Sequence, residues 1–345
     1  MSATHDNQRI ALIVGGGTGA EVVGPVLELL EAAGSSLEFE QIDVAAATAN
    51  SPEDYLDEAV EAVGRHGLGL KTRLAGTTRG ADWHAGRNRA TSPNVELRRR
   101  LDLYAGIRPI VSQPGLPSRY PDLDLVLVRE NTEDIYKGIE HEVVDGLIQS
   151  LKVVTRAACE RISRLAFELA RIENREKVTF IHKANIMKRS DGLFREVFHE
   201  VAASYDDIES EDRIVDAACM QLVLDPYRFD VLLTGNLYGD IISSLGNGLA
   251  GGISNAHSIN LGENKRVFEA IYAPSEDAGS LGRTNPLPMV SAALALLRHA
   301  GEKEVADRVA GAIESTLEAG ETLTPDLGGS STTRQMCDAM GSALS

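Results

Sequence analysis

Residues that can hold anions and move protons gather around the ends of apolar runs in this chain. Guanidinium groups grip carboxylates through two parallel hydrogen bonds, and paired aspartates with water suit a hard divalent cation. The set comprises three guanidiniums, an amine and two carboxylates: Arg98, Arg108, Arg129, Lys183, Asp216 and Asp240. Their types predict a site for a divalent metal and a polycarboxylate. The alternative is that they are ordinary charged residues that bound strands.

A local excess of basic residues stands out against the acidic composition of the chain. The net charge is -17, which argues against nucleic acids and anionic membranes as partners. Yet residues 71–100 contain eight basic and two acidic residues. This segment is either a solvated basic loop or a site for a small polyanion.

Length and cysteine usage indicate a soluble protein of the cytoplasm. A chain of 345 residues predicts one large or two closely packed domains. No apolar run approaches the length that crosses a bilayer, and the start of the chain has no apolar signal segment. Cys159, Cys219 and Cys337 stand singly in helical patterns, so we expect buried free thiols in a reducing compartment.

Strand and helix patterns alternate along the chain and must position the charged set. Expected strands are residues 8–14, 37–43, 122–130, 143–155, 177–183, 229–235 and 266–272. Expected helices are residues 21–33, a segment opened by Ser51-Pro52, residues 94–102, residues 155–171 and most of the chain after Pro286. This alternation predicts an α/β protein whose active residues lie at strand ends. The aperiodic segment 76–93 is expected to be either a functional loop or a mobile one.

Longer motifs make the interpretation more specific. They are SPNVELRRRLDLYAGIRPI (92–110), VRENTEDIYKGIEHEVVDGLIQSLKVVT (128–155), VTFIHKANIMKRSDGLF (178–194), DAACMQLVLDPYRFDVLLTGNLYGD (216–240) and DLGGSSTT (326–333). Together they resemble the isocitrate/isopropylmalate dehydrogenase family, and within it the NAD-dependent isocitrate dehydrogenases. The resemblance runs nearly from end to end.

The resemblance implies a fold that differs from the Rossmann fold. A large discontinuous cofactor-binding domain, residues 1–100 and 257–345, would surround a smaller inserted domain, residues 101–256, that carries the dimer interface and the substrate and metal residues. The active sites of this family are shared across a two-fold dimer. Lys183 and Asp216 would therefore serve the site of the neighbouring subunit in a homodimer or a larger homo-oligomer.

The resemblance also implies roles for individual residues in oxidative decarboxylation. Arg98, Arg108 and Arg129 match the clamps for the substrate carboxylates, and Lys183 matches the residue that handles the proton of the C2 hydroxyl. Tyr136 matches the acid that protonates the enol carbon after CO2 has left. A lysine base needs a lowered pKa, which neighbouring positive charge would provide.

Substrate choice is predicted from Ser92 and Asn94. Polar residues at these positions accompany isocitrate in the family, whereas isopropylmalate enzymes carry apolar ones. Pro93 between them is unusual and stiffens the segment. A tricarboxylate or a close anionic analogue, such as a phosphonate, is the expected substrate.

On the cofactor side the chain departs from the family pattern. GGGTGAE (15–21) replaces the usual GDGIGPE, and YAPSEDAG (272–279) is a shortened, altered form of a cofactor loop. The residues matched to cofactor binding are Thr72, Asn236, Glu269, Asp277 and Asn285. Asp277 aligns with the acid that meets the adenosine ribose, and its charge would repel a 2'-phosphate. NAD is therefore predicted over NADP, while the alternative is that Asp277 only caps a turn.

The metal site departs from the pattern as well. Members of the family commonly carry a second aspartate one helical turn after Asp240, where this chain has Ser244. Asp216 and Asp240 remain as ligands for Mg²⁺ or Mn²⁺, with Ser244 a doubtful third, so weakened metal affinity is expected. The segment 73–91 also looks longer than usual.

Three functions are compatible with these features. The first is NAD-dependent oxidative decarboxylation of isocitrate to 2-oxoglutarate, which the retained Tyr136 and Lys183 favour. The second is a relative specialised for an isocitrate-like acid in secondary metabolism, suggested by the arginine-rich loop. The third is a non-catalytic regulatory subunit that binds citrate-like ligands, suggested by the altered cofactor and metal motifs.

Overall fold

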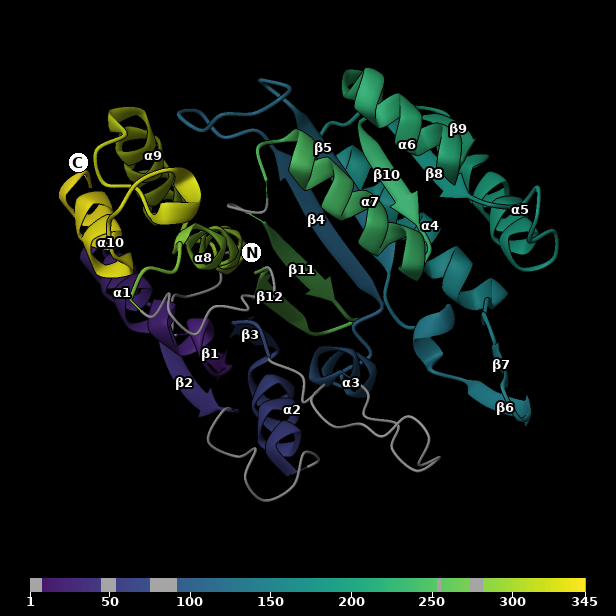
Figure 1. Ribbon diagram of the computed structural model, residues 1–345, viewed down its shortest axis with the longest axis horizontal. Coiled ribbons are helices and arrows are strands. Elements are labelled where there is room, and N and C mark those ends of the chain that lie inside the picture. Colours follow the sequence, from purple (N-terminus) through teal and green to yellow (C-terminus); the bar gives the residue numbers. More distant parts are fainter. Residues whose placement is uncertain (1–7, 45–53, 75–91, 253–255, 273–281, 345) are drawn as a thin grey trace. The chain divides into compact units, whose positions relative to one another are not determined.

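The structure is a computed structural model, and it describes residues 8–44, 54–74, 92–252, 256–272 and 282–344 (Figure 1). The chain forms two compact units. Unit 1 comprises residues 1–76, 113–119 and 251–345, and unit 2 comprises residues 77–112 and 120–250. Compared with the boundaries drawn from the sequence, helix α3 (Pro93–Arg100) belongs to unit 2 and residues 113–119 belong to unit 1.

In unit 1 the described strands follow the order β2, β1, β3, β12, β11. Their bounds are β1 Arg9–Val14, β2 Glu38–Asp43, β3 Leu68–Lys71, β11 His257–Leu261 and β12 Arg266–Ala270. The pairs are parallel except for β11, which runs antiparallel to β12. The strands predicted at 8–14, 37–43 and 266–272 are thus confirmed within a few residues.

Helices complete the core of unit 1. They are α1 (Thr18–Ala32), α2 (Asp54–His66), α8 (Leu287–Ala300), α9 (Lys303–Ala319) and α10 (Thr333–Ser342). Ile10, Leu12 and Val14 pack into one cluster with apolar residues of α1, α8, α9 and α10, because alternate residues of a strand point to the same face. The cap of α2 expected at Ser51 lies outside the described residues.

Unit 2 brings the ends of three parallel strands to one edge. Its described strands follow the order β4, β5, β10, β8, β9, with bounds β4 Ala105–Val111, β5 Asp124–Glu130, β8 Lys177–His182, β9 Glu209–Ile214 and β10 Val231–Thr234. Thr234 of β10 lies in register with Arg129 of β5 and Ile181 of β8. The polar residues that follow these strands therefore begin from neighbouring positions, as the sequence predicted.

Helices cover both faces of the unit 2 sheet (Figure 1). They are α4 (Arg156–Ile172), α5 (Ser190–Ala202), α6 (Val215–Leu224) and α7 (Asn236–Leu249). Ile181 of β8 packs with Leu222 of α6 and Ile242 of α7, whereas the adjacent Phe180 stacks on Phe198 of α5, with ring centroids 5.3 Å apart. Successive strand residues point to opposite faces, so α6 and α7 cover one face and α5 the other.

A hairpin replaces part of one predicted strand. Residues 143–155 were expected to form a strand, but β6 (Glu140–Val144) and β7 (Leu147–Ser150) are two antiparallel strands joined by a turn. Gly146 in this turn has φ +77°, a conformation that glycine adopts without steric cost. The predicted cap of the next helix is confirmed, since the Thr155 hydroxyl accepts a hydrogen bond from the Ala158 amide at 3.3 Å.

Cys159 and Cys337 are buried free thiols, as expected, whereas Cys219 is only partly buried. Burial raises the pKa of the Cys159 thiol to about 12, so it is neutral and unreactive at physiological pH.

Within the described part of the chain, no helix is both long and apolar enough to cross a membrane.

Candidate active site

An arginine pair converges on one aspartate at the carboxyl edge of the unit 2 sheet. Arg129 donates a hydrogen bond from Nη1 to Oδ1 of Asp240 at 2.5 Å, and Arg108 donates from Nη1 to the same oxygen at 3.2 Å. Arg108 also donates to the hydroxyl of Ser243 at 2.5 Å. The strands thus supply the guanidiniums and the first turns of α7 supply their acceptors.

Arg129 is held by further contacts on its other side. It is 1% exposed, and its Nε and Nη2 donate to Oδ1 of Asn236 at 3.0 and 2.7 Å. Burial, together with the charges of Arg108 and Arg98, lowers the pKa of Arg129 to about 10. The group stays cationic at neutral pH. Three positive charges this close together repel one another and favour the approach of anionic groups.

Tyr136 and Asp240 form the exposed part of this cluster. The Tyr136 hydroxyl donates to Oδ2 of Asp240 at 3.0 Å, and the Arg129 guanidinium lies 5.1 Å from the centre of the Tyr136 ring. Burial and the Asp240 charge raise the pKa of Tyr136. Burial opposes ionisation of Asp240, but Arg129 and Arg108 hold its pKa below the ordinary value. Tyr136 is therefore a protonated acid beside an ionised carboxylate.

A glycine lets helix α7 approach Arg129 this closely. A Cβ atom on Gly239 would lie 2.5 Å from Cγ of Arg129 and 2.5 Å from the Thr234 hydroxyl oxygen. These contacts are too short for any residue with a side chain. The NLYGD motif therefore contains a glycine for a steric reason, and Asp240 follows it directly.

Helix α3 carries the residues predicted to select the substrate. Ser92 is its exposed N-cap position, Pro93 its first residue and Asn94 half-buried. The unusual proline is explained by this position, because the fixed φ of proline suits the first turn of a helix. Asn94 and Arg98 are four residues apart and share one helix face, and Arg98 acts on the pKa of Arg129.

Lys183 and Asp216 lie together, and the contacts described for them are separate from those of Asp240. Lys183 follows the end of β8, Asp216 is in the first turn of α6, and the lysine amine donates to the aspartate carboxylate. The side chains are 27% and 69% exposed. An ion pair that is this exposed contributes little stability. Either side chain can therefore leave the other for a different partner at little cost.

The residues predicted to bind a metal are each engaged in other contacts in this structure. Asp240 is engaged by two guanidiniums and a phenol, Asp216 by Lys183, and the exposed Ser244 donates to the backbone oxygen of Asp240 at 3.0 Å. Within the described residues, no three His, Cys, Asp or Glu side chains come together as a metal cluster. Carboxylates are the right donors for Mg²⁺, but the described residues of a single copy do not bring three of them together.

The cofactor residues predicted in unit 1 are engaged inside that unit. The buried Thr72 hydroxyl accepts from the Gly15 amide at 2.7 Å, and Glu269 forms an ion pair with Lys71 at 2.6 Å. Asn285 donates to Asp326 at 2.9 Å. These residues form scaffold contacts, Lys71 is buried rather than part of an open basic surface, and Asp277 lies outside the described residues.

Several residues of the site escaped the sequence interpretation. Ser243 has the type of an ordinary helix residue, and only the structure shows that it accepts from Arg108. Asn236 is predicted from the sequence to bind the cofactor, and the structure adds that its Oδ1 accepts from the guanidinium of Arg129. Lys152, Asp134 and Asp191 lie within the quoted motifs, yet nothing in their types distinguished them from surface charges.

The fold and the cluster define the class of protein: an α/β protein in which arginines, an aspartate and a tyrosine meet at one edge of a mostly parallel sheet. The sequence pattern of the family described as isocitrate/isopropylmalate dehydrogenase matches residues 9–343. The chain belongs to this family, which confirms the prediction made from the motifs.

Individual relatives are similar over nearly their whole length. The chain is 40% identical to the 3-isopropylmalate dehydrogenase of Archaeoglobus fulgidus, over 98% of this chain and 99% of that protein. It is 41% identical to subunit 1 of the mitochondrial NAD isocitrate dehydrogenase of Ajellomyces capsulatus, over 97% of this chain and 86% of that protein. The crystal structure of isocitrate dehydrogenase from Methylococcus capsulatus superposes with a TM-score of 0.88 at 39% identity, covering 98% of this chain and 99% of that one.

Proposed function

We propose that this protein catalyses the NAD-dependent oxidative decarboxylation of a 2-hydroxy-3-carboxy acid, with isocitrate as the substrate and 2-oxoglutarate as the product. The observation that carries the proposal is the cluster of Arg108, Arg129, Asp240 and Tyr136. Relatives at about 40% identity act, by their names, on isocitrate with NAD or on 3-isopropylmalate. Ser92 and Asn94 favour isocitrate, whose additional carboxylate accepts hydrogen bonds from polar groups.

In this proposal the arginines bind and orient the substrate. Arg98, Arg108 and Arg129 neutralise its carboxylates, and the substrate takes the place that the Asp240 carboxylate occupies beside two of them. Arg108 and Arg129 lie on β4 and β5 and are held by residues of α7 before substrate arrives, so little further ordering of these two guanidiniums is needed on binding. NAD supplies the hydride acceptor for the hydrogen on C2.

Lys183 and Tyr136 move the protons. Lys183 removes the proton of the C2 hydroxyl as hydride leaves C2, which gives a β-keto acid that loses CO2. Tyr136 then donates its phenolic proton to C3 of the enol. The raised pKa of Tyr136 keeps that proton in place until the enol forms.

We further propose that two copies of the chain build each site. Apolar side chains are exposed on neighbouring helices α6 and α7, where Met220 is 55%, Leu224 70% and Ile241 51% exposed. Val144 and Ile148 of the hairpin are also exposed, at 61% and 49%. Exposed apolar groups of this number mark interaction surfaces. A second copy would bring its Lys183 and Asp216 to Asp240, where two aspartates would hold Mg²⁺ or Mn²⁺, a Lewis acid for the C2 oxygen.

A substrate comparison tests the chemistry. Purified protein is incubated with Mn²⁺, either NAD or NADP, and isocitrate or 3-isopropylmalate, and reduced nicotinamide is followed by absorbance. Turnover of isocitrate with NAD is expected, and Tyr136→Phe serves as the matched inactive control. Preference for 3-isopropylmalate or for another substituted malate would overturn the substrate assignment. If no such acid is turned over at high metal concentration, the regulatory-subunit alternative is favoured.

Mixed dimers test the shared site. Lys183→Met and Tyr136→Phe proteins are each expected to be inactive, but a refolded equimolar mixture places one intact Tyr136 and one intact Lys183 in a single site of each heterodimer. About a quarter of wild-type activity should return, since half of the dimers are mixed and each has one complete site. No recovery in a mixture shown to contain heterodimers would contradict the shared site. A cytoplasmic location stays a prediction.

A further inference from the structure

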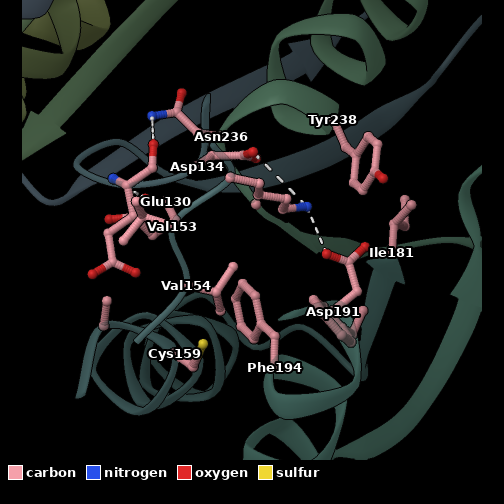
Figure 2. A pocket seen from close by; sticks show the side chains of 15 residues that line it. Glu130, Asp134, Val153, Val154, Cys159, Ile181, Asp191, Phe194, Asn236 and Tyr238 are labelled. Carbon is pink, nitrogen blue, oxygen red and sulfur yellow. Dashed lines mark hydrogen bonds and ion pairs between the residues drawn. The ribbon is translucent and has the colours of Figure 1, made fainter. Parts of the chain in front are cut away.

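A small cavity lies behind the ends of β8 and β10 in unit 2 (Figure 2). Its volume of about 20 Å³ holds a single water and is far too small for a substrate. The side chains of Val154, Cys159 and Phe194 lie together on one side of the cavity, and Lys152 is among the polar residues that line it. The cavity is thus an element of structure rather than a binding site.

Lys152 is the centre of the polar contacts in this cavity. Its amine donates to Oδ1 of Asp191 at 2.6 Å and lies 3.8 Å from Oδ1 of Asp134. It also lies 4.8 Å from the centre of the Tyr238 ring. Both carboxylates are buried, with side chains 5% and 4% exposed. Among the residues that line the cavity, Lys152 is the one lysine or arginine, so it compensates these two buried charges.

Each of the two carboxylates uses its other oxygen to hold the backbone beside the proposed catalytic groups. Oδ2 of Asp191 accepts from the amide of Lys183 at 2.7 Å. Oδ2 of Asp134 accepts from the amide of Leu237 at 3.0 Å, in the first turn of the helix that carries Asp240. Lys152 therefore contacts two carboxylates, and each carboxylate in turn binds the backbone of a different segment of the site.

Asp134 also fixes the turn that carries Tyr136. Its Oδ1 accepts from the amide of Ile135 at 2.8 Å, and its own amide donates to the Val153 oxygen at 2.9 Å. Asp134 has φ +68° and ψ -157°, a conformation that is otherwise almost confined to glycine. Such a conformation persists only where surrounding contacts enforce it, and it marks sites where backbone position matters.

We propose that Lys152 is a positioning residue that sets the place of Lys183 through Asp191, and the places of Tyr136 and helix α7 through Asp134. This inference rests on the proposed function for its catalytic consequence. Lysine suits the position because its compact charge satisfies two carboxylates that approach from different directions, whereas the planar guanidinium of arginine favours one bidentate partner. Without the charge, the two carboxylates repel each other and turn towards water, and the amides of Lys183 and Leu237 lose their acceptors.

Hydrogen exchange tests the positioning independently of turnover. Exchange of the Lys183 and Leu237 amides is measured in the wild type and in Lys152→Met, and the rates are expected to rise about tenfold or more in the variant. The Phe180 amide in the interior of β8 should stay protected. The matched control is Lys177→Met, which removes a lysine at the opposite end of β8 whose side chain is 20% exposed. Unchanged exchange at both amides in Lys152→Met overturns the proposal.

Kinetics then test the catalytic consequence. A displacement of reacting groups by about 1 Å costs about a hundredfold in rate, so Lys152→Met should lower kcat by about that factor while the KM for the acid changes less than about threefold. Lys152→Arg should recover part of the loss in kcat, because it restores a positive charge between the two carboxylates. A kcat equal to that of Lys177→Met overturns the proposal.

Lys152→Met can fail to fold, and the wild type can fail to turn over any substituted malate. If Lys152→Met does not fold, Lys152→Arg takes its place, with faster exchange of the Lys183 amide and a reduced kcat expected; wild-type values in both measurements overturn the proposal. If the wild type turns over no substituted malate, the proposed function fails, and the exchange measurement still decides whether Lys152 holds the two segments.

Discussion

Two ion pairs of similar chemistry, one buried and one half-exposed, have very different surroundings. In unit 1, Lys71 and Glu269 pair at 2.6 Å with side chains 2% and 9% exposed. In unit 2, Arg129 and Asp240 pair at 2.5 Å, but Arg129 is 1% exposed and Asp240 47%. The first pair is sealed on both sides. The second presents one partner to solvent, where another anion can replace it.

The contacts around the two pairs lead to different roles. Asn260 donates to Glu269 at 2.8 Å, so the unit 1 carboxylate has its partners within the core and stabilises the junction of β3, β11 and β12. Asp240 instead meets the Tyr136 hydroxyl, a second arginine and water. Removing one partner of a buried charge pair lowers the stability of the fold, because the other charge stays buried without compensation. A half-exposed pair can instead exchange partners during a reaction. Exposure, rather than residue type, separates scaffold from site.

The largest effect is expected from removing the buried arginine of the exposed pair. Arg129→Met removes the guanidinium that donates to Asp240 and Asn236, leaving Asp240 with Arg108 and Tyr136, and it removes one of the proposed clamps for a substrate carboxylate. Truncating one partner of a buried, hydrogen-bonded charge pair costs about 2–5 kcal/mol, so kcat/KM should fall by about thirtyfold or more. Steady-state kinetics measure this, with Arg99→Met on the exposed side of α3 as the control. A loss smaller than about threefold would show that Arg129 is scaffold, like Lys71.

The sealed pair should affect stability instead. Lys71→Met leaves the Glu269 carboxylate buried without its cation, which costs about 3–5 kcal/mol in the free energy of unfolding. The double variant Lys71→Met/Glu269→Gln removes both charges and should recover more than half of that loss. Urea denaturation gives both values. If the double variant folds normally but its KM for NAD rises tenfold, Glu269 contacts the cofactor as the sequence suggested, and the contrast between the pairs fails.

A change in metal affinity tests whether the helix face that carries Asp240 binds the metal. Ser244→Asp places a second carboxylate one helical turn after Asp240, the arrangement common in the family. Because hard divalent cations bind more tightly as carboxylate ligands are added, the Mn²⁺ concentration for half-maximal activity should fall about tenfold. Ser244→Asn is the uncharged control. Equal Mn²⁺ requirements for the wild type, Ser244→Asp and Ser244→Asn would mean that this helix face does not bind the metal.

A smaller effect is expected in the pH dependence of stability. Arg129 and Arg108 lower the pKa of Asp240 in the folded protein, so the ionised carboxylate stabilises the fold above the unfolded pKa of about 3.9. This contribution is lost as the pH falls through the lower, folded pKa. The difference in unfolding free energy between wild type and Asp240→Asn should therefore shrink between pH 6 and the acid range, as followed by denaturation at several pH values. A constant difference would indicate that the arginines do not act on Asp240.

Much of the fold was predictable because its signals are local. The apolar runs before Arg129 and Lys183 gave their strands within a few residues, and the Thr155 cap gave the start of α4. The strand predicted at 143–155 is confirmed only in part, because the chain turns at Gly146 and forms the hairpin of β6 and β7, in which Val144 is 61% exposed. A pattern that normally indicates a half-buried strand cannot reveal what covers it.

By itself, the sequence determined the types of residue in the site and the elements that carry them. Arg129, Lys183 and Asp240 lie at or just after the carboxyl ends of strands whose apolar patterns were recognisable in the sequence. Only the tertiary structure decided which of these charges meet and how far each is exposed. Ser243 joined the site, Glu269 was sealed against Lys71, and Lys152 was placed between two carboxylates. The reason is physical: secondary structure depends on neighbours in the chain, whereas pairing and desolvation of a charge depend on strands and helices that are distant in sequence.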